Sequence, residues 1–263
     1  MSARTSGRAG TGFGRPLRMS RSSTTWRVLC TQVGCSTTWS SWRTLRRGRG
    51  FSRLGPGQAT WPLAERGLQV VGVELGERLA VVARRKLAEF PNVEIVTAPF
   101  EVWEPASGGG FDALAFTAFH WIDPNARYAK AARLLREGGA LAVVSTKHVL
   151  APGGDAFWSE VQEDYDAVVP SEQNRPPPRP EEVADLSDEI DASSRFRTVA
   201  VRRYLWDVSY DARSYIALFD TASGHRAMPE AKREALYTRI RERMGDRKVS
   251  KTLQAILNVA RRL

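Results

Sequence analysis

The chain has 263 residues, 42% hydrophobic and 26% charged, which is enough to bury the core of one large α/β domain or two small ones. No stretch approaches the roughly 20 apolar residues of a membrane span and the N-terminus has no apolar secretion signal, so a cytoplasmic location is predicted. The net charge is +10, but residues 1–60 hold 11 Arg and no Lys, Asp or Glu. Residues 61–263 hold 28 basic against 29 acidic side chains, so the charge does not predict a nucleic-acid partner.

Cysteines and histidines are too few for a metal site. Cys30 and Cys35 both lie in the first 60 residues, and the remaining 203 residues have no cysteine. His120, His148 and His225 are the only histidines and are far apart in the sequence. We therefore expect no disulfide framework and no metal cofactor.

From Gly67 onward, short apolar runs alternate with helical patterns, which is typical of a parallel sheet with crossover helices. Strands are predicted at 70–74, 93–97, 111–116 and 140–145, with helices at 78–90 and 125–136. Further along, helices are predicted at 155–167, 212–221 and 230–244, and long strands at 196–210 and 249–261. The pattern predicts a doubly wound, Rossmann-like α/β sheet with an antiparallel edge.

Ligands of such sheets bind at the carboxyl ends of the strands. Gly55 and Gly57 precede a helical pattern, where glycines let the backbone approach a cofactor closely. Seventeen residues beyond Gly57, Glu74 ends a strand, a position from which an acid commonly binds ribose hydroxyls. Turn glycines and a surface glutamate are the alternative interpretation.

Further motifs follow in a fixed order: Gly57-Gln58-Ala59-Thr60, Pro62-Leu63-Ala64-Glu65-Arg66-Gly67, Val73-Glu74, Phe111-Asp112, Phe119-His120-Trp121 and Leu134-Leu135-Arg136-Glu137-Gly138-Gly139. Together they resemble the class I S-adenosylmethionine-dependent methyltransferases of the small-molecule type. The resemblance implies a seven-stranded sheet with an antiparallel last strand, S-adenosyl-L-methionine as cofactor and a small-molecule methyl acceptor.

The resemblance also implies roles for individual residues. Gly55 and Gly57 would contact the methionine part of the cofactor, Glu74 the ribose, and the loop with Ala98, Phe100 and Glu101 the adenine. Phe119 would lie beside the cofactor at the methyl-transfer face, with His120 as the candidate base. Trp121 and Tyr128 would contact the acceptor. For these aromatic residues, core packing is the alternative, and His120 could be a positioning residue.

One segment departs from the family pattern. The family requires a strand ending in an acid before the glycine loop, whereas this chain reads Arg49-Gly50-Phe51-Ser52-Arg53-Leu54. Synonymous codons exist for Gly50 to Gly57 that, two bases out of frame, encode Val-Leu-Glu-Ile-Gly-Pro-Gly. We therefore hypothesise that much of residues 1–56 is a disordered or out-of-frame segment. We predict that it either stays outside the sheet or destabilises it, and that it impairs activity. An organelle transit peptide is the rival interpretation.

The predicted organisation is thus a basic segment, 1–56, and a methyltransferase domain, 57–263, with lid insertions at 151–195 and 211–245. Two other functions remain open. An NAD(P)-dependent Rossmann oxidoreductase shares the glycine turn and strand-end acid, but Tyr128 and Lys130 do not have the Tyr-x-x-x-Lys spacing of short-chain dehydrogenases. The other alternative is a non-functional, mis-translated chain.

Overall fold

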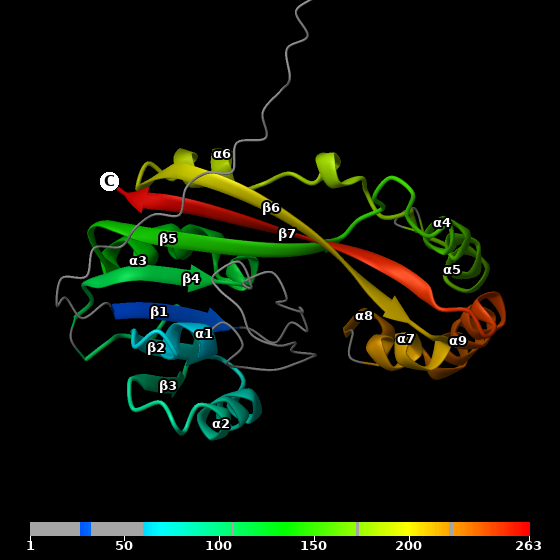
Figure 1. Cartoon of the computed structure of the whole chain (residues 1–263), viewed down its shortest axis with the longest axis horizontal. Coiled ribbons are helices and arrows are strands. Elements are labelled where there is room, and N and C mark those ends of the chain that lie inside the picture. The colour runs from blue at the N-terminus through cyan, green and yellow to red at the C-terminus, as the bar shows by residue number, and fades with distance from the viewer. Residues whose placement is uncertain (1–26, 33–59, 107, 172–173, 221–222) are drawn as a thin grey trace, which may run out of the picture.

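The structure is a computed structural model that describes residues 27–32, 60–106, 108–171, 174–220 and 223–263 (Figure 1). Its strands form one mixed sheet in the order β3-β2-β1-β4-β5-β7-β6. The strands are β1 (Arg27–Gln32), β2 (Gln69–Glu74), β3 (Val93–Thr97), β4 (Phe111–Phe116), β5 (Leu135–His148), β6 (Phe196–Tyr210) and β7 (Val249–Arg262). Neighbours among β1 to β5 pair in parallel, whereas β7 runs antiparallel to both β5 and β6. The predicted α/β class is therefore confirmed.

The first strand differs from the prediction. Residues 27–32 pair in parallel with β2 on one side and β4 on the other. Of the two alternatives expected for residues 1–56, staying outside the sheet is thus wrong for these six residues. Their sequence, Arg-Val-Leu-Cys-Thr-Gln, includes apolar and β-branched residues that suit a central strand. Residues 49–57, from which the prediction was argued, lie outside the described residues.

Helices connect the parallel strands as the sequence pattern predicted. They are α1 (Trp61–Ala64), α2 (Glu77–Lys86) and α3 (Pro124–Leu134). Helix α3 begins at a proline, and the preceding Asp123 caps it by accepting a 2.9 Å hydrogen bond from the Asn125 backbone N–H. Asp123 is therefore the N-cap residue of α3.

Strand β5 is longer than predicted. The helix was predicted to end near Arg136 and the strand to begin at Ala140, but the strand begins at Leu135, directly after the helix. Leu135 pairs with Phe111 while Ala140 pairs with Ala113. The intervening residues thus form a bulge, which explains why a glycine pair that reads as a helix end lies within a strand.

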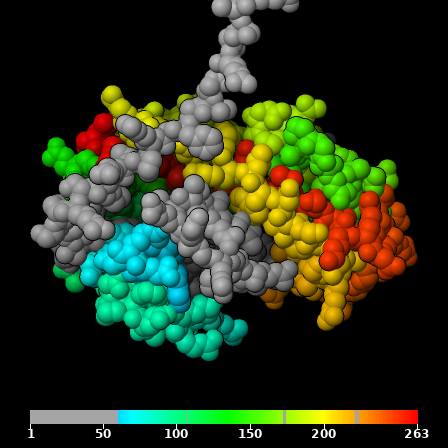
Figure 2. Space-filling model, viewed as in Figure 1, coloured from blue at the N-terminus to red at the C-terminus, as the bar shows by residue number. Residues whose placement is uncertain are grey.

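The C-terminal half adds a helical lobe to the sheet. The lobe consists of α4 (Phe157–Glu160), α5 (Gln162–Val168), α7 (Ala212–Phe219), α8 (Ser223–Arg226) and α9 (Glu230–Met244). Its core is separate from that of the sheet and is formed by buried residues of these helices together with Tyr210 and Val249 at the strand ends. The surfaces of α2 and of α9 lie far apart in the space-filling view (Figure 2).

The two predicted lid insertions are organised differently. Residues 211–245 contribute only to the helical lobe, through α7, α8 and α9. The 151–195 insertion is divided: α4 and α5 join the lobe, whereas α6 (Ser187–Ala192) packs on β6 and buries Ile190 in the core of the sheet. Among the described helices, none is long and apolar enough to cross a membrane.

Candidate functional site

The parallel strands β2, β3 and β4 end at one edge of the sheet, at Glu74, Thr97 and Phe116. Strand β5 passes this edge at Val143 and continues to His148, paired with β7. Strands β1 and β4 point toward the helical lobe, which lies beyond this edge (Figure 1). Because ligands of doubly wound sheets bind outside the carboxyl ends of the strands, this edge is the candidate site.

Glu74 is the most informative residue of the edge. It is only 4% exposed, and its Oε1 accepts a 2.8 Å hydrogen bond from the Gly76 backbone N–H. Its Oε2 is buried and has no hydrogen-bond partner within the described part of the chain. Burial raises the pKa of Glu74, and hydrogen bonds from the backbone N–H groups of Gly76 and Leu75 oppose this rise. A buried carboxylate oxygen without a partner is costly unless a ligand donates to it.

The predicted adenine loop follows β3 next to Glu74. The Ala98 backbone N–H donates to the Glu74 carbonyl at 3.1 Å, which fixes the loop against the end of β2. Phe100 is 6% exposed and its ring packs edge-on against Phe116 at 5.2 Å, within the core. Glu101 is exposed, and its carboxylate accepts a 3.4 Å hydrogen bond from the Asp123 backbone N–H. This loop therefore adjoins the buried glutamate, with the Phe100 ring already committed to packing.

Residues Phe119–Trp121 form a short 3-10 helix, η2, just after β4. Phe119 is 2% exposed and its ring contacts Phe116 at 4.9 Å and Tyr128 at 5.1 Å. His120 and Trp121 are both exposed, Trp121 by 66%, and the centres of their rings lie 5.4 Å apart. Partial burial, together with nearby Lys147 and Arg127, lowers the pKa of His120. The imidazole is therefore biased toward its neutral form, which can accept a proton.

Tyr128 points into the core and has a protein partner. It is 8% exposed, and its hydroxyl donates to the Glu189 carboxylate at 2.5 Å. Arg127 also pairs with Glu189, at 2.5 Å. Burial and the Glu189 hydrogen bond raise the pKa of the Tyr128 hydroxyl well above its usual range. These contacts link α3 to α6 and account for Tyr128 without a ligand.

Gly55 and Gly57, the predicted contacts to the methionine part of the cofactor, lie outside the described residues. Within the described ranges, no group of three or more His, Cys, Asp or Glu side chains is arranged to hold a metal ion. Sequence reasoning missed a set of polar side chains on the inner ends of β5, β6 and β7. These are His148, Trp206 and Lys251.

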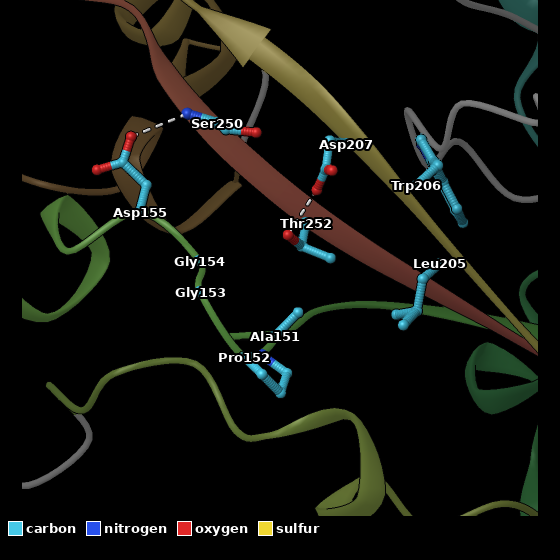
Figure 3. Close-up of a pocket in the computed structure, with 10 residues that line it drawn as sticks. All are labelled: Ala151, Pro152, Gly153, Gly154, Asp155, Leu205, Trp206, Asp207, Ser250 and Thr252. Atoms are coloured by element: carbon cyan, nitrogen blue, oxygen red, sulfur yellow. Dashed lines mark hydrogen bonds between the residues drawn. The ribbon is translucent and has the colours of Figure 1, made fainter.

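A hollow lies where the loop after β5 passes β6 and β7 (Figure 3). Asp155 accepts a 3.1 Å hydrogen bond from the Ser250 backbone N–H, and the Thr252 hydroxyl donates to Asp207 at 2.6 Å. Both carboxylates are thus satisfied by neighbouring protein groups. The lining is completed by Ala151, Pro152, Gly153, Gly154, Leu205 and Trp206. These hydrogen bonds give the hollow a structural explanation.

Comparison with known proteins finds a methyltransferase-like segment in the chain. The methyltransferase domain family matches residues 54–139, which include β2 to β4 and the strand-end glutamate. The chain is 36% identical over 91 residues to uncharacterized methyltransferases of Mycobacterium tuberculosis H37Rv and Mycobacterium bovis. Over this segment the chain is similar to methyltransferase domains. Each match covers 34% of this chain and 36% of the relative, so the chain spans about a third of the length of the curated relatives it matches.

Solved structures share the fold. A chain from Anaeromyxobacter dehalogenans assigned to the type II methyltransferases has a TM-score of 0.52 and 18% identity, and the match covers 89% of both chains. The YcgJ protein from Bacillus subtilis has a TM-score of 0.50 and 17% identity, with 90% of this chain and 92% of that chain covered. At these identities the likeness shows the fold alone. The oxidoreductase alternative finds no support in these matches.

Proposed function

We propose that this protein transfers a methyl group from S-adenosylmethionine to a small-molecule acceptor. The observation that carries the proposal is Glu74, whose buried Oε2 has no hydrogen-bond donor in the described residues and lies at the carboxyl edge of the sheet. A ribose hydroxyl would donate to this oxygen. The second oxygen, Oε1, is already held by Gly76, so the carboxylate is oriented before any ligand binds.

The remaining cofactor contacts come from the loops beside Glu74. Ala98 and Glu101 lie on the loop after β3, next to the ribose position, and would flank the adenine. The rings of Phe100 and Phe119 support these loops from the core. Gly55 and Gly57 would form the floor under the methionine part, as the family resemblance implies.

S-adenosylmethionine, when bound, supplies a methyl group on a positively charged sulfur that is already activated for transfer. The protein must therefore orient the acceptor and, for a protonated nucleophile, remove one proton. The exposed His120 follows β4 at the same edge, and its lowered pKa keeps the imidazole neutral and able to take that proton. Trp121, 66% exposed beside it, is available for contact with the acceptor.

The helical lobe would cover the acceptor as a lid. It lies beyond the carboxyl ends of β1 and β4 (Figure 1), and its helices come from the insertions that follow β5 and β6. A lid over this edge leaves room for a small molecule better than for a folded protein or a nucleic acid. The acceptor is therefore proposed to be a small molecule.

Calorimetric titration of S-adenosylmethionine into wild type and Glu74→Ala tests this proposal. We expect Glu74→Ala to weaken binding by about 1 to 3 kcal/mol, because hydrogen bonds to a charged group are lost. Glu89→Ala, which removes an exposed carboxylate from the segment after α2, is the matched control and should bind as wild type does. Equal affinity in Glu74→Ala would remove Glu74 from the site, and binding of NADH in place of S-adenosylmethionine would overturn the methyltransferase proposal.

A further inference from the structure

Lys251 occupies an unusual position on β7. Every second residue of this strand projects from the same face of the sheet. On the face of Lys251 the neighbouring residues are apolar: Val249, Leu253, Ala255 and Leu257. Its ammonium group lies 5.5 Å from the centre of the Trp158 ring. Burial alone lowers the pKa of Lys251 to about 8. A cation on the apolar side of a strand is therefore held against an aromatic wall.

Acidic side chains near Lys251 are engaged elsewhere. No ion pair joins Lys251 to any described carboxylate. Asp155 accepts from the Ser250 backbone, Asp207 from Thr252 and Asp220 from the Tyr237 hydroxyl at 3.1 Å. Residues 1–60 contain no acid at all, so almost no carboxylate remains outside the described residues that could pair with Lys251.

Two other polar groups on the same strands also lack partners. In the pairing register His148 of β5 lies opposite Leu253 of β7, and Trp206 of β6 lies opposite the same leucine. Directly paired residues project from one face of a sheet, so His148, Trp206 and Lys251 share a face. His148 Nε2 and Trp206 Nε1 are buried and have no hydrogen-bond partner among the described residues.

The three groups have a common chemical requirement. Lysine and tryptophan side chains donate hydrogen bonds and accept none, and a neutral imidazole can donate through Nε2. Burial and the nearby Lys251 lower the pKa of His148 to about 3, so its ring is neutral. The set therefore carries one positive charge and suits an acceptor-only group with one negative charge, which describes a carboxylate better than a doubly charged phosphate.

The surroundings of the three groups are aromatic. The His148 ring meets Trp158 edge-on at 4.3 Å, and Trp158 meets Tyr215 at 5.3 Å. His225 stacks on Phe219 at 4.1 Å and shares a 3.0 Å hydrogen bond with the Tyr165 hydroxyl. All of these rings except His148 belong to the helical lobe.

We propose that Lys251 and Trp206, with His148 beside them, bind the carboxylate of a small acid that carries an apolar, aromatic-sized body, and that this acid is the methyl acceptor. The second part rests on the proposed methyltransferase function. The carboxylate is an anchor, so the group that receives the methyl lies elsewhere on the acceptor. Selection of the acceptor then depends on β5 to β7 and the helical lobe, outside the part of the chain that matches the family.

Binding of radiolabelled phenylacetate to the full chain by equilibrium dialysis tests the site. Lys251→Met should weaken binding at least tenfold, because the charge is lost, and Trp206→Phe about three- to tenfold, because one donor is lost. Lys251→Arg retains the charge and should recover part of the affinity. Lys248→Met, which removes an exposed lysine three residues away, should bind as wild type does. Phenylacetamide should bind wild type and Lys251→Met equally, since it carries no charge.

Two outcomes would overturn the site: equal phenylacetate affinity in wild type and Lys251→Met, or tighter binding of phenyl phosphate than of phenylacetate. Calorimetry with S-adenosylmethionine separates this proposal from the function. Lys251→Met should retain cofactor affinity, because Lys251 and its neighbours lie apart from Glu74 in the fold. Phenylacetate binding through Lys251, without S-adenosylmethionine binding even when residues 50–59 are replaced by Val-Leu-Glu-Ile-Gly-Pro-Gly-Thr-Gly, would defeat the methyltransferase proposal and leave the acid site standing.

Discussion

In the part of the chain that the structure describes, buried charged side chains have ion-pair partners inside the helical lobe but lack them at the sheet edge and at the junction with the lobe. Within the lobe, Asp164 is 3% exposed and receives Arg243 at 2.5 Å and Arg239 at 3.2 Å. At the sheet edge and at the junction with the lobe, Glu74 and Lys251 are buried or partly buried without such partners. A paired buried charge serves the fold, whereas an unpaired one costs stability and is explained more readily by a ligand.

The family match follows the same division. It ends at residue 139, before most of β5 and before every helix of the lobe. The matched part includes Glu74 and the loop after β3, to which we assign the cofactor. The unmatched part includes Lys251 and the aromatic residues around it, so the proposed cofactor and acceptor sites lie in separate parts of the chain.

The largest expected effect concerns residues 50–57. Replacing these residues together with Gln58 and Ala59 by Val-Leu-Glu-Ile-Gly-Pro-Gly-Thr-Gly would supply the acid and glycine loop that the family requires. We expect S-adenosylmethionine affinity to rise at least 100-fold, about 3 kcal/mol, measured by calorimetry. Phenylacetate affinity should stay the same, because the Lys251 site draws on none of these residues. Sequencing the gene and translating it in both frames provides the direct check. Equal cofactor binding by wild type and the variant with the replaced segment would refute the out-of-frame hypothesis.

Asp164→Asn should break the paired charge of the lobe. Arg243 and Arg239 would lose their buried carboxylate, although both remain partly exposed, so we expect a loss of about 2 kcal/mol in the free energy of unfolding. Urea denaturation gives this value. Asp188→Asn, an exposed acid on α6, should change stability little. If the two variants were equally stable, the pairing of Asp164 would not support the lobe.

Lys251→Met, in contrast to Asp164→Asn, should raise the free energy of unfolding of the ligand-free protein. The folded-state pKa of about 8 lies below the ordinary 10.5, so between these values the unfolded chain binds more protons and wild-type stability rises with pH. Below pH 8 the folded state carries the full cost of the buried charge. We expect the variant to be more stable by about 2 kcal/mol at pH 7, after discounting for solvent, with the difference shrinking toward pH 10.5.

Denaturation of wild type and Lys251→Met at pH 7 and pH 10 measures this difference. A variant that is less stable than wild type at pH 7 would show that Lys251 serves the fold, in which case it resembles Asp164 and not Glu74. Combined with the loss of phenylacetate binding, a gain in stability is the signature of a residue kept for a ligand at a cost to the fold.

The smallest expected effect concerns the start of α3. Asp123→Ala removes the side chain that caps the helix at the Asn125 N–H, and we expect a loss of about 1 kcal/mol in unfolding free energy. Asp123→Ser retains a capping oxygen and should restore most of the stability. Cofactor affinity should not change in either variant. A marked loss of cofactor affinity in Asp123→Ser would indicate a role in the site beyond capping.

Much of the sheet was predictable because its strands are strongly patterned. The predicted strand at 93–97 and the helix at 230–244 agree with β3 and α9 in both bounds. Short elements such as α6 and α8 were missed, because four to six residues do not complete a helical period clearly. Strand β5 was shortened because a bulge contains two glycines, a pattern that indicates a helix end when read alone.

Some residues of the candidate sites could be predicted from the sequence and others could not. Glu74 was predicted from its place after a strand and its distance from the glycines, and its burial agrees with that role. Lys251 was missed because a single lysine forms no motif. The signal was present in the alternation of β7, where Lys251 occupies the apolar parity between Val249 and Leu253. His148 and Trp206 become partners of Lys251 only through strand pairing, which the sequence does not specify.

The length of β5, β6 and β7 has a mechanical consequence. Strand β7 remains hydrogen-bonded to β6 from Val249 to Arg262, so one continuous ladder passes from the sheet into the core of the lobe. Rotation of the whole lobe would require this ladder to bend or break, unlike a domain joined by a loop hinge. The strand ladder therefore acts as a stiff arm that holds the lobe at a fixed distance from the carboxyl ends of β2 and β4.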